Sequence, residues 1–367
     1  DFPSVFQAWN PVDMPEYPQS TLNKRLEYAA KHDLLWEEPI SQLGYGVDLV
    51  LGVIWDHEYQ GLAQQFTDET LEQALDNRKT MLSTNPNMVF LMEIRWRDAP
   101  DSYLPDDSEW WLRHKDGSRV EGWLGGPEPY YMLNYENAEF QDHIAEQAAV
   151  AIESGVYDGI MLDWSGYLPV VRKVRERIGD SGLVIVNIHD DIEDGEKYQE
   201  YINGAFMELN VMDRLYHPSE QNKRNWDSVR VALQWFEENF REPRVNCLEV
   251  WGDRTDLRRM RATTTLGLTC SDGYVLYGDP NWLKTPDHLH DWYDFWDVEL
   301  GQPIKPGKQC ENGAFSREFD HATVIYNPEN NGEVAVTFEQ ERKRVSDGTI
   351  GTTFTIQDID GDIFLKQ

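Results

Sequence analysis

Cysteine is scarce in this chain of 367 residues, which contains only Cys247, Cys270 and Cys310. The odd number excludes a framework in which every cysteine is paired, and no two of them have the spacing of a metal-binding pair. Cys247 falls in an expected strand and Cys270 at an expected helix end, so we expect both to be buried thiols.

Basic residues are also few. The chain has 33 of them against 66 acidic residues, which gives a formal net charge of −33. Binding to DNA or RNA needs a basic surface, so this balance argues against a nucleic-acid partner. It is typical of a strongly solvated acidic surface, such as one adapted to salty water, and it disfavours long-range attraction of an anionic polymer.

Long apolar runs are missing as well. No stretch approaches the roughly 18 apolar residues that cross a bilayer, so we expect no membrane partner. The chain opens with DFPSVFQAW, which lacks the basic start and apolar segment of a signal peptide. We interpret it as a mature secreted or periplasmic protein. The sequence carries no signal for an oligomeric state.

What the chain does contain is a regular alternation of short apolar runs and helical patterns. Expected strands lie at 3–9, 47–55, 88–94, 159–162, 183–188, 205–209, 244–251 and 273–277. Segments with helical spacing separate most of them, for example 21–32, 67–82, 137–153 and 226–240. Eight strand-then-helix units in about 290 residues predict a (β/α)8 TIM barrel. A doubly wound open sheet is the alternative, but no glycine-rich turn follows the first strand.

The last part of the chain changes character. After the linker GQPIKPGK the hydrophobic period falls to two, and turn signals such as Asp347-Gly348 and Asp360-Gly361 separate the segments. We therefore predict a catalytic barrel over 1–300, a linker over 301–309 and a small antiparallel β domain over 310–367. A domain of this size is expected to pack on the barrel.

Acidic residues stand at or near the ends of several expected strands. Asp163 ends the run YDGIMLD, Glu208 and Glu249 lie in the sixth and seventh strands, and Glu93 lies in the third. The carboxyl ends of barrel strands meet on one face, so these side chains are expected to converge. Cleavage of a glycosidic bond needs a proton donor and a second carboxylate, which such a set supplies.

Two other uses of the same carboxylates remain open. They can hold Mg²⁺ or Ca²⁺, and His57 and His189 can add nitrogen ligands for zinc. No H-E-x-x-H pattern is present, and we interpret the site as one without metal or other cofactor. A lone Asp after a strand can also simply cap a helix or pair with an arginine.

Aromatic residues follow many of the expected strands. The set comprises Trp9, Trp55, Trp96, Trp164 and Trp251. Indole rings stack on apolar sugar faces, so these residues predict a sugar-binding floor; a ring of packing residues at the barrel rim is the alternative. Arg95 and Arg254 are expected to neutralise carboxylates or to bind an acid group of a substrate. His189 is a further candidate substrate contact.

A long connection follows the third strand, from Arg97 to Glu136. It contains a hairpin signal at Asp116-Gly117 and seven aromatic residues, among them Trp110 and Trp111. Connections of this length are usually functional or disordered, and the aromatic content argues against disorder. We predict that Trp110 and Trp111 line the substrate cleft; an outer cap or an oligomer contact is the alternative.

The run YDGIMLDW resembles the fourth-strand signature of the α-galactosidase-like superfamily of TIM-barrel glycoside hydrolases, and a more distant similarity connects it to endo-α-1,4-polygalactosaminidases. The resemblance covers about Phe2 to Asp279. It implies a glycoside hydrolase in which Asp163 is the nucleophile and Glu208, in NGAFMEL, the acid/base of a retaining mechanism on an α-linkage. Glu249 is the rival acid. A carbohydrate-binding barrel without catalysis is the competing hypothesis.

Overall fold

The computed structural model describes most of the chain. The described residues are 2–9, 21–39, 50–124, 128–164, 166–211, 225–280 and 288–367. They fall into two compact units. The N-unit comprises Ala8–Ile188 and Glu196–Asn203, and the C-unit comprises Asp1–Gln7, His189–Gly195 and Gly204–Gln367.

One eight-stranded sheet has the order β1-β2-β3-β6-β7-β8-β9-β10. Its strands are β1 (Phe6–Ala8), β2 (Leu34–Glu37), β3 (Val89–Glu93), β6 (Gly159–Leu162), β7 (Leu183–Asn187), β8 (Gly204–Leu209), β9 (Cys247–Trp251) and β10 (Tyr274–Gly278). Its strands pair in parallel, and a parallel bridge from Val5 to Val275 joins the first strand to the last. The predicted barrel is therefore confirmed.

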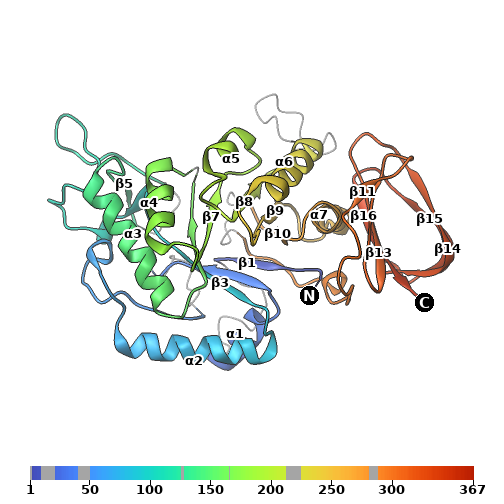
Figure 1. The fold of residues 1–367 in the computed structure, drawn as a ribbon, viewed down its shortest axis with the longest axis horizontal. Helices are drawn as coiled ribbons and strands as arrows, with labels where there is room; N and C mark the ends of the chain where they lie inside the picture. The colour runs from blue at the N-terminus through green and yellow to red at the C-terminus, as the bar shows by residue number, and fades with distance from the viewer. Residues whose placement is uncertain are drawn as a thin grey trace. The chain divides into compact units, whose positions relative to one another are not determined.

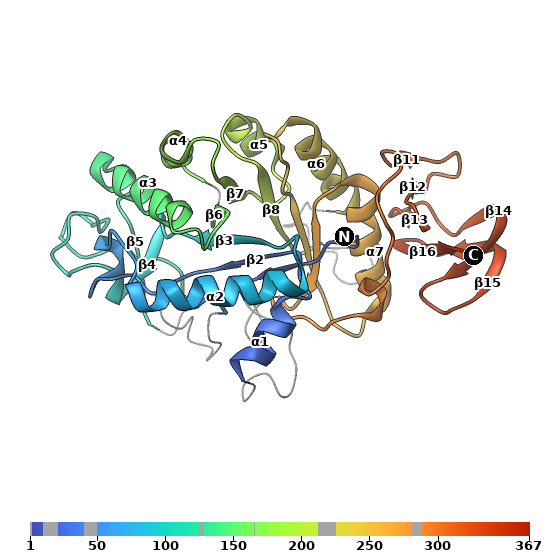
Figure 2. The same cartoon turned by 60° about the horizontal axis from the view of Figure 1, so that its bottom comes forward.

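Helices alternate with these strands, as the apolar spacing predicts. They are α1 (Leu22–Ala29), α2 (Asp68–Thr84), α3 (Ala138–Glu153), α4 (Leu168–Ile178), α5 (Ile192–Tyr198), α6 (Trp226–Asn239) and α7 (Leu257–Cys270). Local chemistry fixes several starts: Asn137 caps α3, and Asn225 forms a capping box with Ser228 at α6. In the N-unit, α3 and α4 lie side by side, as Figure 2 shows.

The second barrel strand differs from the sequence prediction. We expected it at Val47–Trp55, but β2 is Leu34–Glu37, and residues 50–55 form no strand apart from a single bridge at Trp55. The reason is local, because the backbone N–H groups of Val50 and Leu51 donate to the side chain of Glu37 instead of joining a strand ladder. Residues 47–49 lie outside the described residues.

A second sheet is antiparallel and has the order β11-β12-β13-β16-β14-β15. Its strands are β11 (Lys308–Gln309), β12 (Phe315–Glu318), β13 (Ala322–Asn327), β14 (Val334–Arg344), β15 (Ile350–Ile356) and β16 (Asp360–Lys366). Phe354, Ile356 and Phe364 belong to its apolar core. The predicted C-terminal β domain is present, and its first strand begins inside the stretch predicted as a linker. The domain boundaries at 300 and 310 remain predictions.

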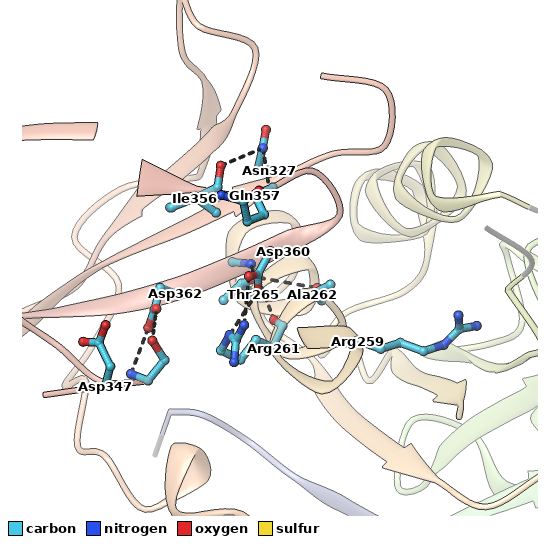
Figure 3. A network of polar contacts seen from close by, with 12 residues as sticks. Arg259, Arg261, Ala262, Thr265, Asn327, Asp347, Ile356, Gln357, Asp360 and Asp362 are labelled. Carbon is cyan, nitrogen blue, oxygen red and sulfur yellow. Dashed lines mark hydrogen bonds and ion pairs between the residues drawn. The ribbon is translucent and has the colours of Figure 1, made fainter. Parts of the chain in front are cut away.

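Helix α7 packs against β13 and β16 of this sheet, as Figure 1 shows. Arg261 on α7 binds Asp360 on β16 through two hydrogen bonds, Nε to Oδ1 at 3.0 Å and Nη2 to Oδ2 at 2.8 Å (Figure 3). Arg259, two residues earlier, points to the other side of α7, where it donates to the carbonyl oxygens of Trp251 and Val211. One helix therefore contacts both the small sheet and the ends of β8 and β9.

The Arg261–Asp360 pair is expected to stabilise this docking. Both side chains are largely shielded, with 19% and 11% exposure. Asp360→Asn should lower the free energy of unfolding by about 2 kcal/mol, between the values for exposed and buried pairs. Urea unfolding measures this loss. The control is Asp347→Asn in the turn between β14 and β15, because Asp347 is 48% exposed and its contact with Arg344 is longer, at 3.6 Å; equal losses in the two variants would contradict the prediction.

Candidate active site

Four residues beyond the ends of barrel strands have left-handed backbone conformations that side chains other than glycine rarely adopt. They are Trp9 (φ 52°), Trp164 (φ 64°), His189 (φ 55°) and His288 (φ 61°). Such conformations cost free energy and concentrate at functional sites, where the surrounding structure holds them. The residues that follow β1, β6, β7 and β10 are therefore candidates for a functional site.

In the N-unit, Asp163 follows β6 directly and is partly exposed. Its Oδ1 accepts a hydrogen bond of 2.9 Å from Nδ2 of Asn187, at the end of the neighbouring strand β7. Its backbone carbonyl accepts a 2.7 Å bond from Nε1 of Trp96. The carboxylate is therefore oriented by its neighbours and still reachable from solvent.

A buried charge cluster lies in the same unit, centred on Arg95. The guanidinium binds Glu38 with two hydrogen bonds, of which the one from Nη2 measures 2.7 Å, and it lies 3.6 Å from Glu93 and 3.7 Å from Asp98. Arg95 is 9% exposed and the three carboxylates are 1–2% exposed. One cation therefore compensates several carboxylates that are removed from water.

Burial raises the pKa of Glu93 well above its ordinary value. Arg95 opposes this shift, whereas the charges of Glu38 and Asp163 add to it. Burial also raises the pKa of Asp98, again against the effect of Arg95. Glu93 accepts a hydrogen bond from Nε1 of Trp9, whose ring meets Trp36 edge-on at 5.4 Å. Glu93 thus holds a proton more readily than an exposed glutamate does.

Arg95 has little capacity left for a ligand. The Nε and Nη2 groups of its guanidinium already donate hydrogen bonds to Glu38. An acid group of a substrate would therefore have to displace that carboxylate. Arg254 in the C-unit is occupied in the same way: it binds both oxygens of Asp279 at 2.9 and 2.6 Å and Asp291 at 3.0 Å. Both arginines neutralise carboxylates, which is the first of the two roles that the sequence predicts.

The C-unit contains a second carboxylate pair. Glu208 on β8 and Glu249 on β9 are register partners. Glu249 is fully buried, and both of its oxygens lie within hydrogen-bond distance of Nδ1 of His288. Nε2 of the same ring lies 3.7 Å from Oε1 of Glu208, whose side chain is 17% exposed. Of the two glutamates, Glu208 is therefore the one that solvent can reach.

The tryptophans expected at strand ends have different surroundings. Trp164 is 37% exposed and carries the guanidinium of Arg97 over its ring at 4.0 Å. Trp96 and Trp251 are 4% and 8% exposed, and Trp55 is 6% exposed and packs on Phe66 at 4.2 Å. Trp164 thus presents more ring surface to a ligand than these three do.

Trp110 and Trp111 pack within the long connection and on α3. Trp110 meets Phe140 at 5.3 Å and His143 at 4.9 Å. Trp111 is 2% exposed and lies beside Tyr131 at 6.0 Å. The connection also contains β4 (Asp98–Pro100) and β5 (Tyr130–Met132), which pair with each other. A cleft role for the two tryptophans stays a prediction.

The sequence analysis does not identify the residues that bind or face the candidate acids and Arg95. These partners are Glu38, Asp98, Asn187 and His288. Glu38 follows LLWE, and this short run was passed over in favour of the longer VDLVLGVIW. His288 stands in the run His288-Leu289-His290, but nothing in that spacing indicates a contact with a carboxylate on β9. Within the described ranges, no group of three or more His, Cys, Asp or Glu residues is arranged to hold a metal ion.

In the same ranges, no helix combines the length and apolar composition needed to cross a membrane.

Glu37, beside the cluster, is expected to make stability depend on pH. Burial raises its pKa to about 7, although N–H groups of Val50 and Leu51 oppose the shift. The folded state therefore binds a proton more tightly than the unfolded state, so this stabilisation is present below about pH 4.5 and is lost as pH rises toward 7. The change amounts to about 3 kcal/mol.

Glu37→Gln should flatten this dependence between pH 4.5 and 7, as measured by urea unfolding across that range. Glu58→Gln, at an exposed position, is the control and should follow the wild-type curve. A wild-type slope that survives in Glu37→Gln would show that another group is responsible.

Comparisons with known proteins agree with this architecture. Solved structures match almost the whole chain. The noncanonic maltogenic α-amylase AmyB from Thermotoga neapolitana has a TM-score of 0.57 at 12% identity, covering 99% of both chains. The α-amylase from Malbranchea cinnamomea has a TM-score of 0.58 at 11% identity, covering 99% of this chain and 96% of the other. The fold is shared with α-amylases.

A further match is the isomalto-dextranase of Arthrobacter globiformis T6 in complex with panose. Its TM-score is 0.51 at 10% identity, and the match covers 99% of this chain and 72% of that one. No family model matches the sequence, and no curated protein matches it. At these identities the likeness concerns the fold, so the chemistry has to be argued from the site.

Proposed function

We propose that this chain is a glycoside hydrolase that cleaves an α-linkage in an oligo- or polysaccharide, with Asp163 as nucleophile and Glu208 as acid/base. The observation that supports the proposal is the position and accessibility of the Asp163 carboxylate. It is a partly exposed carboxylate at the end of a barrel strand, oriented by Asn187 and bordered by the buried cluster around Arg95. A carboxylate that is fixed and accessible in this way suits attack on an anomeric carbon.

The proposed reaction has two steps. In the first, an Asp163 oxygen forms a bond to the anomeric carbon while the bond to the leaving oxygen breaks, and Glu208 gives that oxygen a proton. In the second, Glu208 takes a proton from water, whose oxygen displaces Asp163 and restores both carboxyl groups. Direct attack requires a separation of about 5–5.5 Å between the two carboxyl groups.

Other groups have supporting roles in the proposal. Asn187 and Trp96 hold the side chain and backbone of Asp163, and Trp164 is the exposed ring on which a sugar would stack. Glu93, with its raised pKa, would donate a hydrogen bond to a substrate hydroxyl. Trp9, His189 and Trp251 remain proposed substrate contacts.

The solved neighbours support an α-glycan as substrate class, since two are named as α-amylases and one as an isomalto-dextranase. Membership of the α-galactosidase-like superfamily and a secreted or periplasmic location are further parts of the proposal. The excess of acidic residues supports an enzyme exposed to salt.

The test is a hydrolysis screen of the purified protein against α- and β-linked polysaccharides and aryl glycosides, with sizing of the products. We expect release of sugar from at least one α-linked substrate. NMR of the first-formed anomer should show retention of configuration. Binding without hydrolysis across the whole panel would instead identify a carbohydrate-binding barrel.

A further inference from the structure

His288 connects two carboxylates of the C-unit. Its Nδ1 lies 2.8 Å from Oε2 and 3.0 Å from Oε1 of Glu249, and its Nε2 lies 3.7 Å from Oε1 of Glu208. Because Glu208 and Glu249 are register partners on adjacent strands, one imidazole ring spans both strands. The side chain of His288 is 3% exposed, so its contacts are made in a dry environment.

The backbone is adapted to this contact. His288 has a φ of 61°, in the left-handed region. A Cβ added to Gly278 would lie 2.9 Å from Oε1 of Glu249 and 3.4 Å from the backbone of His288. A larger residue at the end of β10 would therefore press on the carboxylate of Glu249 and on the backbone of His288, which favours the glycine there.

The two carboxylates determine which nitrogen of the His288 ring carries a proton. Both oxygens of Glu249 face Nδ1, so the carboxylate accepts the Nδ1 proton and Nε2 is turned toward Glu208. A neutral ring has a lone pair on Nε2 and accepts a proton from Glu208; a charged ring donates to the Glu208 carboxylate. One proton thus serves both groups, and a contraction of about 1 Å would close the hydrogen bond between them.

Among the described residues, the polar groups next to His288 include Asp279 and His290. Its backbone N–H donates to the carbonyl of Asp279, whose carboxylate is bound by Arg254. Burial lowers the pKa of His290 to about 4, which leaves that ring neutral near pH 7. Glu249 therefore faces the ring at Nδ1, on the side opposite to Glu208 at Nε2.

We propose that His288 is a positioning residue which, held by Glu249, orients the Glu208 carboxyl group and shares its catalytic proton. This inference rests on the proposed function. When Glu208 gives its proton to the leaving oxygen, the resulting carboxylate stays beside Nε2, and the proton that returns from water restores the starting state. His288 has no net gain or loss of protons over the cycle.

Two substitutions at His288 separate its contacts. His288→Asn keeps an amide near Nδ1 but removes the group that faces Glu208, whereas His288→Gln does the reverse. Both should lower kcat by about 10-fold or more with little change in KM. The loss should shrink on aryl glycosides with good leaving groups, which need no proton from Glu208. His114→Gln, at an exposed position, is the control and should match the wild type.

Glu249→Gln keeps the shape of the contact and removes its charge. The pair of Glu208 and His288 then holds its proton less tightly, so the basic limb of the pH profile of kcat/KM should move down by about one pH unit. Full wild-type activity with an unchanged pH profile in His288→Asn and Glu249→Gln would overturn the inference.

A measurement without activity keeps the inference separate from the proposed function. The ¹⁵N NMR signals of His288, assigned by their loss in His288→Gln, should show a proton on Nδ1 in the wild type, and the Nε2 signal should change in Glu208→Gln. A signal unaffected by Glu208→Gln would overturn the inference. An altered signal in a protein that hydrolyses no sugar would uphold the shared proton and reject the glycosidase proposal.

Discussion

Asp163→Asn is expected to abolish hydrolysis, with a loss of kcat on the order of 10⁴-fold or more, because the amide cannot attack the anomeric carbon. The fold should survive, since the asparagine oxygen still accepts the hydrogen bond from Asn187. Oligosaccharide binding, measured by calorimetry, should remain close to that of the wild type.

Asp142→Asn is a matched control, because Asp142 is an exposed aspartate on α3 that pairs with Lys173. It should leave kcat unchanged. If Asp163→Asn keeps wild-type turnover on a true substrate, Asp163 is not the nucleophile, and the proposed mechanism has to be rebuilt around another carboxylate.

Arg95→Met should produce the largest loss of stability, about 3–5 kcal/mol at pH 7, because it leaves buried carboxylates without their cation. Arg95 lies within ion-pair distance of Glu38, Glu93 and Asp98, all of them buried. Arg97→Met is the control. Arg97 is two residues away, 31% exposed and 3.6 Å from Asp98, so its loss should cost much less.

The pH dependence of this loss has a definite sign. Burial already raises the pKa of Glu93 and of Asp98, and removal of the guanidinium raises both further. Because these carboxyl groups have a higher pKa in the folded state, the folded state binds protons at a higher pH than the unfolded state does. The variant therefore regains stability as pH falls from 7 toward about 5. Urea unfolding at several pH values measures this, and a loss that stays constant over the range would contradict the electrostatic explanation.

Most of the fold was predictable because its signals are local. The apolar runs at 159–162, 183–188 and 205–209 became β6, β7 and β8 within a residue or two, and the helical spacing over 226–240 became α6. The exception was β2. Its four residues, LLWE, form a weaker pattern than the run at 47–55, whose described part is tied to Glu37 through its backbone.

The site was predictable only in part. Acids at strand ends could be named from the sequence: Asp163 directly follows β6 and Glu208 is the last residue but one of β8, while their catalytic roles stay predictions. Their partners could not be named. Glu38, which binds Arg95, directly follows β2, a strand that the sequence analysis places at 47–55. His288 contacts Glu249 across 39 residues and has a left-handed backbone conformation that no spacing rule indicates.

The most direct test of the central claim is mass spectrometry of Glu208→Gln during turnover of an aryl glycoside from the screen. A good leaving group departs without the acid, but the second step lacks its base, so a glycosyl-enzyme should accumulate. We predict a mass gain of one glycosyl group, located by peptide mapping on Asp163. Release of the inverted anomer, or an adduct on a residue other than Asp163, would contradict the account.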